Sequence, residues 1–196
     1  MINWKEINHF SAEEFSEDPT HLAEPELIIS LDQFRSVINK RIFPSPVKGA
    51  LARIGGSPAS QHYIGNSLRQ PVRKTTAVDI FCEGIPLENY QTLLSLNLFN
   101  GVGIYLDTTG PDGLPWIMFH VDIRPLGFNK QFPLIWFTKK TQNKNQYFYP
   151  QNQPTNWNLF NDSRLSCVKQ FGTSLSSTID QNHIRRSSHL GKNPLL

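Results

Sequence analysis

The sequence predicts an α+β domain in which helices pack on one side of a mainly antiparallel sheet and a cleft lies on the other side. Two observations support this fold class. Stretches near residues 25–40 and 86–100 have the apolar spacing of amphipathic helices. Short apolar runs lie between and after these stretches, and turn-forming residues separate several of them. Elements in this order bury one face of a sheet under helices.

The helical stretches have recognisable starts and stops. Ser11 and Glu14 have the spacing of a capping box, which predicts a short helix. Pro25 occupies a first helical position. One apolar stripe follows at helical spacing, formed by Leu27, Leu31, Phe34 and Ile38. We therefore expect a helix over about residues 25–40. Pro86 opens a second long helix, and Asn100-Gly101 is expected to end it.

Five segments are expected to form the strands of the sheet. Residues 77–82 are apolar and rich in β-forming residues. Residues 102–106 and 116–123 flank a glycine- and proline-containing turn, which predicts a hairpin. Residues 134–137 and 147–149 flank a polar stretch and predict a second hairpin.

Length and composition fit one domain with a polar extension. A chain of 196 residues, 38% of them hydrophobic, can bury one core. We expect a folded domain over residues 1–150. Residues 151–196 are rich in Asn, Gln and Ser, which indicates a partly disordered C-terminal extension.

Charge and hydropathy exclude several classes of protein. The formal net charge of +3 would suit an anionic cell wall. No run of basic residues alternates with aromatic residues that could stack on bases, so nucleic-acid binding is not expected. No apolar run approaches the roughly 20 residues of a transmembrane segment. The first residues show no signal-peptide pattern. We expect synthesis in a cytoplasm, with action at the cell wall if the protein is encoded by a phage.

Two histidines and an aspartate from three separate segments form a candidate metal site. His62 follows a turn-rich loop, Asp79 lies within an apolar strand, and His120 lies within a predicted hairpin. A carboxylate in a buried strand is costly unless it is paired or binds metal, which favours Asp79 as a ligand. Two imidazoles and a carboxylate, with one position open for water, form the ligand set of a catalytic zinc site.

Asp122 is the candidate catalytic residue. His120 and Asp122 are two positions apart, so in a strand both point to one face. The Asp122 carboxylate could then act as the general base that accepts a proton from the attacking water. The alternative is that Asp122 orients a ligand histidine or pairs with Arg124. Glu83 and Asp107 are reserve candidates for the base.

Three sequence blocks, spanning about residues 8–126, resemble the peptidase M15 family. The family pattern Ser-x-His-x-x-Gly-x-Ala-x-Asp is matched by Ser60, His62, Gly65, Ala77 and Asp79. The second block is Gly-Val-Gly-Ile-Tyr at residues 101–105, and the third is His-Val-Asp-Ile-Arg at residues 120–124. Members of this family, from phages and bacteria, are zinc-dependent D-alanyl-D-alanine carboxypeptidases and L-alanyl-D-glutamate endopeptidases of peptidoglycan.

The resemblance implies a fold, a cofactor and an activity. It implies a hedgehog/DD-peptidase-like fold, a Zn²⁺ ion bound by His62, Asp79 and His120, and hydrolysis of amide bonds in peptidoglycan stem peptides. A protein of this kind would act as a monomer or as part of a phage or virion assembly. The alternative function is a catalytically silent phage structural or wall-binding protein that keeps the scaffold. A hydrolase of ordinary proteins is a third possibility.

The chain departs from the family pattern at two places. Pro44 stands where the family has an arginine that helps to bind substrate. Residues 66–76 are an insertion that separates His62 from Asp79 by 17 positions, more than in the family.

The insertion can be interpreted in two ways. It is either a solvated surface loop or a segment that reaches over the cleft. In the second case Arg69, Arg73 or Lys74 would replace the missing arginine as a clamp for a carboxylate or an oxyanion. Together with Ser60 and Arg124, Arg69 and Arg73 are the candidate substrate-binding residues.

Overall fold

The structure has mixed α and β content, with a six-stranded sheet and few helices. The computed structural model describes residues 1–125, 133–141 and 144–149, so the predicted extension at 151–196 lies outside the described residues. In chain order the elements are η1 (Ala12–Glu14), α1 (Pro19–Leu22), α2 (Pro25–Ile38), β1 (Ile42–Pro44), β2 (Ala77–Cys82), α3 (Pro86–Leu96), β3 (Gly101–Thr109), β4 (Pro115–Asp122), β5 (Leu134–Thr141) and β6 (Lys144–Phe148).

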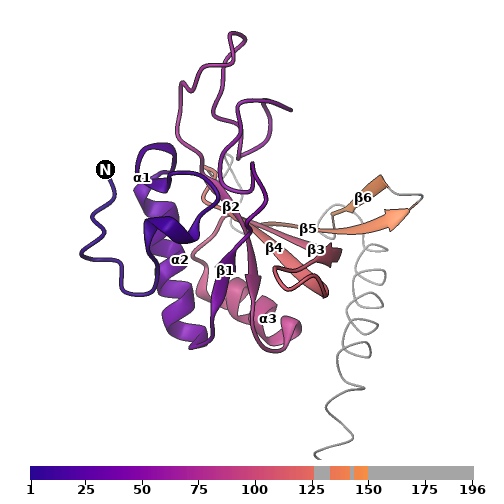
Figure 1. The fold of residues 1–196 in the computed structure, drawn as a ribbon. Coiled ribbons are helices and arrows are strands. Elements are labelled where there is room, and N and C mark those ends of the chain that lie inside the picture. Colours follow the sequence, from indigo (N-terminus) through magenta and orange to yellow (C-terminus); the bar gives the residue numbers. More distant parts are fainter. Residues whose placement is uncertain (126–132, 142–143, 150–196) are drawn as a thin grey trace, which may run out of the picture.

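The strand order in the sheet is β1-β2-β4-β3-β5-β6 (Figure 1). Neighbouring strands are antiparallel except β3 and β5, which are parallel. The mainly antiparallel sheet confirms the coarse fold class. Both expected hairpins are present, as β3–β4 and β5–β6. The three-residue strand β1, which was not predicted, pairs with β2 at the edge of the sheet.

Both long helices end at an asparagine in the left-handed conformation. Asn39 follows α2 with φ 49°, and Asn97 follows α3 with φ 52°. Asparagine tolerates this conformation better than most residues and therefore ends helices. The expected stop of α3 at Asn100 was wrong, because Asn100 joins the sheet: its backbone N–H donates to the Asp122 carbonyl (2.8 Å). Within the described residues, no helix is long and apolar enough to cross a membrane.

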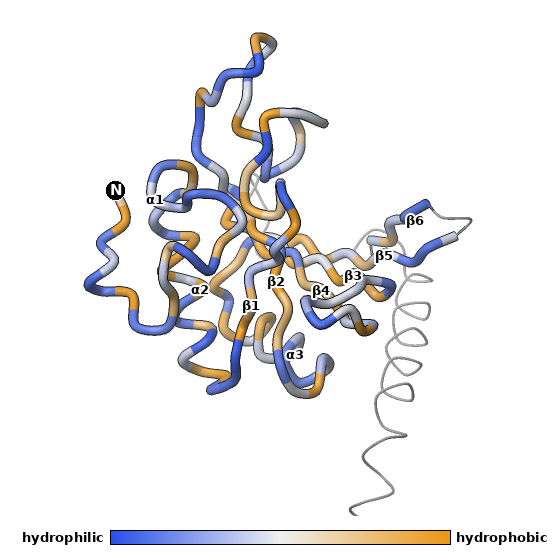
Figure 2. The backbone as a smooth tube through the Cα atoms, in the orientation of Figure 1, coloured by the Kyte–Doolittle hydropathy of each residue, from blue (hydrophilic) through white to orange (hydrophobic). Residues whose placement is uncertain are grey.

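One face of the sheet forms the hydrophobic core. Ile80 of β2, Phe119 of β4 and Ile104 of β3 are register partners and belong to one buried cluster. Phe34 of α2 and Leu93 of α3 belong to the same cluster. Both long helices therefore cover this face. Figure 2 shows the hydrophobic residues concentrated in the central strands.

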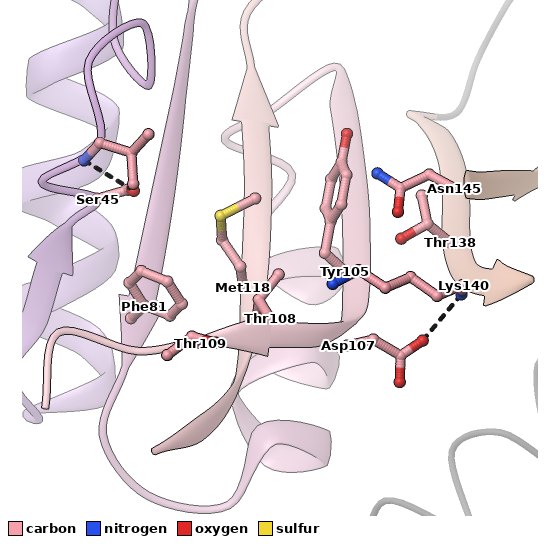
Figure 3. Close-up of a pocket in the computed structure, with 11 residues that line it drawn as sticks. Ser45, Phe81, Tyr105, Asp107, Thr108, Thr109, Met118, Thr138, Lys140 and Asn145 are labelled. Atoms are coloured by element: carbon pink, nitrogen blue, oxygen red, sulfur yellow. Dashed lines mark hydrogen bonds between the residues drawn. The ribbon is translucent and has the colours of Figure 1, made fainter. Parts of the chain in front are cut away.

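The opposite face of the sheet carries the candidate site. One row of register partners across β2, β4, β3 and β5 consists of Asp79, His120, Gly103 and Trp136. The next row along the strands consists of Phe81, Met118, Tyr105 and Thr138. The second row lines a cavity of about 340 Å³ (Figure 3). The candidate ligands and this cavity thus share one face.

Candidate metal centre

The sheet fixes Asp79 and His120 relative to each other. They are register partners on β2 and β4, and both point away from the core. Side chains of directly opposed residues in antiparallel strands have their Cβ atoms about 4.5–5.5 Å apart. The pairing of β2 with β4 therefore sets the position of two of the three candidate ligands.

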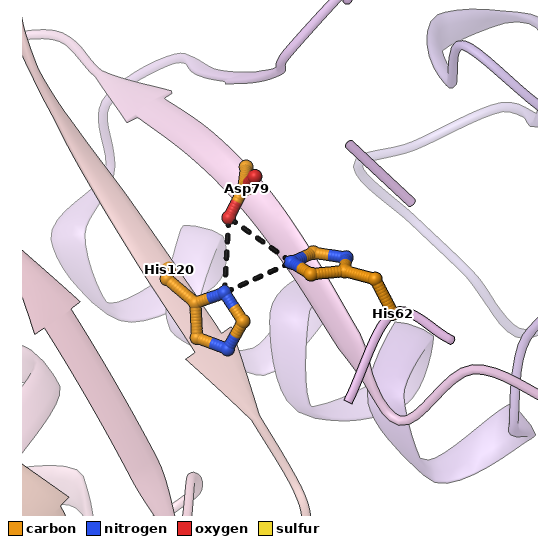
Figure 4. A group of neighbouring side chains, drawn as sticks. All are labelled: His62, Asp79 and His120. Carbon is orange, nitrogen blue, oxygen red and sulfur yellow. Dashed lines mark hydrogen bonds and ion pairs between the residues drawn. The ribbon is translucent and has the colours of Figure 1, made fainter. Parts of the chain in front are cut away.

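His62 comes from the long loop between β1 and β2. The Arg53 N–H donates to the His62 carbonyl (2.9 Å), and the Ile64 N–H donates to the Arg53 carbonyl (3.0 Å). The imidazole is buried, and its Nδ1 lies 3.1 Å from the Leu51 carbonyl oxygen. These contacts direct the Nε2 atom of His62 toward Asp79 and His120 (Figure 4).

The Leu51 carbonyl is held in place by residues that the sequence analysis missed. Thr75 is fully buried, and its Oγ1 lies 2.8 Å from the same oxygen. The Glu17 carboxylate accepts hydrogen bonds from the backbone N–H groups of Gly49, Leu51 and Ala52. A carboxylate that binds several backbone amides fixes the path of the segment that orients His62.

Three possible metal-ligand atoms converge in this His-Asp-His cluster. Nε2 of His62 lies 2.9 Å from Nδ1 of His120. Oδ1 of Asp79 lies 3.0 Å from Nδ1 of His120 and 3.3 Å from Nε2 of His62 (Figure 4). Ligand atoms of a tetrahedral site with bonds of about 2.0–2.1 Å are about 3.3 Å apart. The cluster can therefore hold a metal ion after only small movements of its atoms.

The hydrogen-bond partners of the two imidazoles indicate which ring nitrogens carry a hydrogen and which present a lone pair to the cluster. The Leu51 carbonyl can only accept, so Nδ1 of His62 carries the hydrogen and Nε2 has a lone pair. Oδ2 of Asp122 lies 3.1 Å from Nε2 of His120, so this nitrogen carries the hydrogen and Nδ1 has a lone pair. Two imidazole lone pairs and the Asp79 carboxylate then face one another. Either a metal ion or a proton on His120 must neutralise their repulsion.

The pKa values of His120 and Asp79 are both shifted in the direction that favours positive charge beside the Asp79 carboxylate. Burial lowers the pKa of His120, but its hydrogen bonds to Asp122 and Asp79 outweigh burial and raise this pKa to about 8. Burial raises the pKa of Asp79, but its hydrogen bonds to His120 and His62 outweigh burial and lower this pKa well below its usual range. Asp79 is therefore ionised at neutral pH. A metal ion at this place would replace the proton on His120.

Asp122 lies behind His120, at the nitrogen that points away from the cluster. It is fully buried and accepts hydrogen bonds from Nε2 of His120 and from the backbone N–H (3.1 Å), Nε (2.7 Å) and Nη2 of Arg124. The Arg124 guanidinium lies over the Trp136 ring, 5.4 Å from its centre. This placement favours the orienting role of Asp122 over the general-base role, which stays a prediction. The substrate-binding role of Arg124 also stays a prediction.

The other candidate substrate-binding residues lie in the loop around His62. Ser60 Oγ accepts a hydrogen bond from the His62 backbone N–H (3.3 Å). Arg73 is exposed, and its Nε donates to the Tyr63 carbonyl (2.6 Å), so it ties the insertion to the loop that carries His62. Arg69 is exposed and has a φ of 58°. Residues 67–73 of the insertion are exposed, and Arg73 binds the backbone of its own loop. The role of Arg69 and Arg73 in substrate binding stays a prediction.

The reserve candidates for the general base lie apart from the His-Asp-His cluster. Glu83 is exposed immediately after β2. Asp107 lies in β3, lines the cavity and accepts a hydrogen bond from the Lys140 backbone N–H (2.9 Å). Pro44 is buried in β1 as the register partner of Ile80.

The first and third residues of the Gly-Val-Gly block are glycine because side chains of neighbouring strands fill their space. A Cβ on Gly101 would overlap the Asp122 carboxylate, and a Cβ on Gly103 would overlap the Trp136 ring.

We expect Gly103→Ala to lower the free energy of unfolding by about 1–3 kcal/mol, because the buried indole of Trp136 must move. Urea unfolding measures this loss. Gly55→Ala is the matched control, since a Cβ there meets open space; an equal loss in both variants would contradict the explanation.

No protein-family model, curated protein or solved structure matches this chain. The likeness to the peptidase M15 family therefore depends on the three sequence blocks alone. The three residues that the sequence suggested as ligands meet in one place, which is compatible with a metal site.

Proposed function

We propose that this protein is a zinc-dependent peptidase that hydrolyses amide bonds in peptidoglycan stem peptides, on a hedgehog/DD-peptidase-like fold. The observation that carries the proposal is the convergence of Nε2 of His62, Oδ1 of Asp79 and Nδ1 of His120. Two imidazoles and one carboxylate form a ligand set of catalytic zinc sites. The resemblance of the three sequence blocks points to peptidoglycan as the substrate.

The residues around the cluster suit this chemistry. Zinc in such a site polarises a carbonyl group and lowers the pKa of a water molecule. The Leu51 carbonyl and the Asp122 carboxylate would keep each imidazole in the tautomer that presents a lone pair to the ion. Hydrolysis also needs a proton acceptor. Asp122 is the candidate that the sequence suggests for this role, although its hydrogen bonds to His120 and Arg124 favour an orienting role, and Glu83 and Asp107 are the reserves.

Turnover of muropeptides tests the proposal. We expect zinc-loaded protein to release a new amine from purified muropeptides, detected by liquid chromatography with mass spectrometry. A chelator should abolish the release, and added zinc should restore it. Unchanged muropeptides in the presence of protein with bound zinc would contradict the peptidase proposal.

A second candidate is a catalytically silent phage structural or wall-binding protein. The observation that favours it is the state of Asp122, whose carboxylate is already bound by His120 and Arg124. Pro44 in place of the family's arginine points the same way. Such a protein would sediment with insoluble peptidoglycan without releasing stem peptides.

A further inference from the structure

The cavity begins one row of side chains away from the His-Asp-His cluster. Two positions beyond Asp79 and His120 on the same strands are Phe81 and Met118, and both line the cavity. Two residues of a strand advance about 6.6–6.8 Å, and residues two apart point to the same face. A molecule with one bond at the cluster can therefore continue directly into the cavity.

The cavity extends along the sheet away from the cluster. On β3 its lining runs from Tyr105 to Thr109, and on β5 it includes Thr138 and Lys140. Lys140 is four positions beyond Trp136, the residue of β5 that is in the same row as the cluster. Four residues of a strand span about 13 Å, which is also the length of three or four residues of an extended peptide.

The lining offers an apolar floor, two hydroxyl groups and a lysine side chain. Phe81 and Met118 provide apolar surface, while Ser45 and Thr138 provide hydroxyl groups. Figure 3 shows the Lys140 side chain extending from β5 across the sheet toward Tyr105. Within the described residues, the Lys140 ammonium forms no ion pair.

Asp107, the acidic residue of the lining, does not neutralise this ammonium through an ion pair. Its Oδ2 accepts a hydrogen bond from the backbone N–H of Lys140 (2.9 Å) instead (Figure 3). A lysine ammonium that lines a cavity without an ion pair is suited to an anionic group of a ligand. A carboxylate is the anionic group that peptides carry.

We propose that the cavity binds the part of a peptide substrate that continues beyond the cleaved bond, and that Lys140 binds a carboxylate of that part. The inference rests on the proposed function and narrows it. Figure 3 shows the Lys140 side chain reaching toward Tyr105, which is one row of side chains away from the His-Asp-His cluster. The substrate is therefore an acidic peptide with a carboxylate in the part that lies in the cavity.

The carboxylate can come from two places in a stem peptide: the C-terminus or an internal acidic residue. Calorimetric titration of zinc-loaded protein with a stem peptide in free-acid form measures the binding. Two further peptides, one amidated at the C-terminus and one amidated at the internal carboxylate, identify the source. Lys140 recognises the carboxylate whose amidation weakens binding of the peptide to the wild-type protein.

Lys140→Gln should weaken binding of the free-acid peptide about tenfold or more, because a hydrogen bond to a charged group is lost. Lys139→Gln is the matched control: Lys139 is also exposed, and its side chain points to the other face of β5. We expect the control to bind like the wild type. For the peptide that is amidated at the carboxylate recognised by Lys140, the affinities of Lys140→Gln and of the wild type should be equal.

The outcomes separate this inference from the proposed function. Equal affinity of the wild type and Lys140→Gln for the free-acid peptide would overturn the subsite, even if the protein hydrolyses muropeptides. Absence of binding to the wild type would overturn it as well. Binding that depends on Lys140 would support the subsite, even if chromatography of the same mixtures shows no cleavage and the peptidase proposal fails.

Discussion

Replacing His120 with alanine should remove bound zinc from the purified protein. His120 would supply one of the three ligand atoms, and Asp122 could not replace it because Arg124 binds the Asp122 carboxylate. We expect the zinc content to fall from about one ion per chain to near zero. Inductively coupled plasma mass spectrometry of dialysed protein measures this content.

The same variant should also lose stabilisation by added zinc. A ligand that binds only the folded state at 1,000 times its Kd adds about 4 kcal/mol to the free energy of unfolding. The wild type should gain about this much in urea unfolding with zinc, and His120→Ala should gain none. His21→Ala is the control, since His21 is exposed and pairs with Asp18 far from the cluster in the sequence. Full zinc occupancy in His120→Ala would contradict the assignment.

Asp122→Asn should weaken zinc binding about 10- to 100-fold, because a carboxylate that accepts a hydrogen bond from a ligand histidine orients and polarises its imidazole. The asparagine oxygen can still accept from Nε2 of His120, but it carries no charge to hold Arg124. Turnover at saturating zinc should then stay close to that of the wild type. Competition with a chromophoric chelator measures the zinc affinity.

The general-base role of Asp122 predicts the opposite pattern for the same variant. Turnover would fall about 10²- to 10⁴-fold while zinc affinity stays unchanged. Asp112→Asn serves as the control, because Asp112 is an exposed carboxylate in the turn between β3 and β4. If Asp122→Asn loses turnover by this much and binds zinc with normal affinity, Asp122 is the general base and the orienting role is contradicted.

Side-chain alternation in strands explains why much of the site could be predicted. Asp79 interrupts an apolar strand, and His120 and Asp122 share the polar face of another, so period-two patterning alone places these groups on one side of the sheet. The apolar partners at the alternate positions, such as Ile80 and Phe119, identify the core face in the same way. Both hairpins were predictable because their strands are close in the sequence.

Long-range backbone contacts explain what could not be predicted. Glu17 binds the amide groups of Gly49, Leu51 and Ala52. Any residue except proline provides such an amide, so no side-chain pattern in the sequence identifies the partners of Glu17. The parallel pairing of β3 with β5 depends on how the chain returns to the sheet, which the pattern of each strand does not specify. The end of α3 was misplaced because Asn97 and Asn100 have the same local preference, and only the sheet decides between them.

The different origins of the three ligand residues have a consequence for the rate at which metal would exchange. Asp79 and His120 can separate only if the pairing of two central strands is broken. His62 can leave by a local opening of its loop, which a few backbone hydrogen bonds resist. Local openings have lower free energies than unfolding of a central sheet. Dissociation should therefore start at His62, and the lifetime of the bound ion should follow loop opening rather than global unfolding.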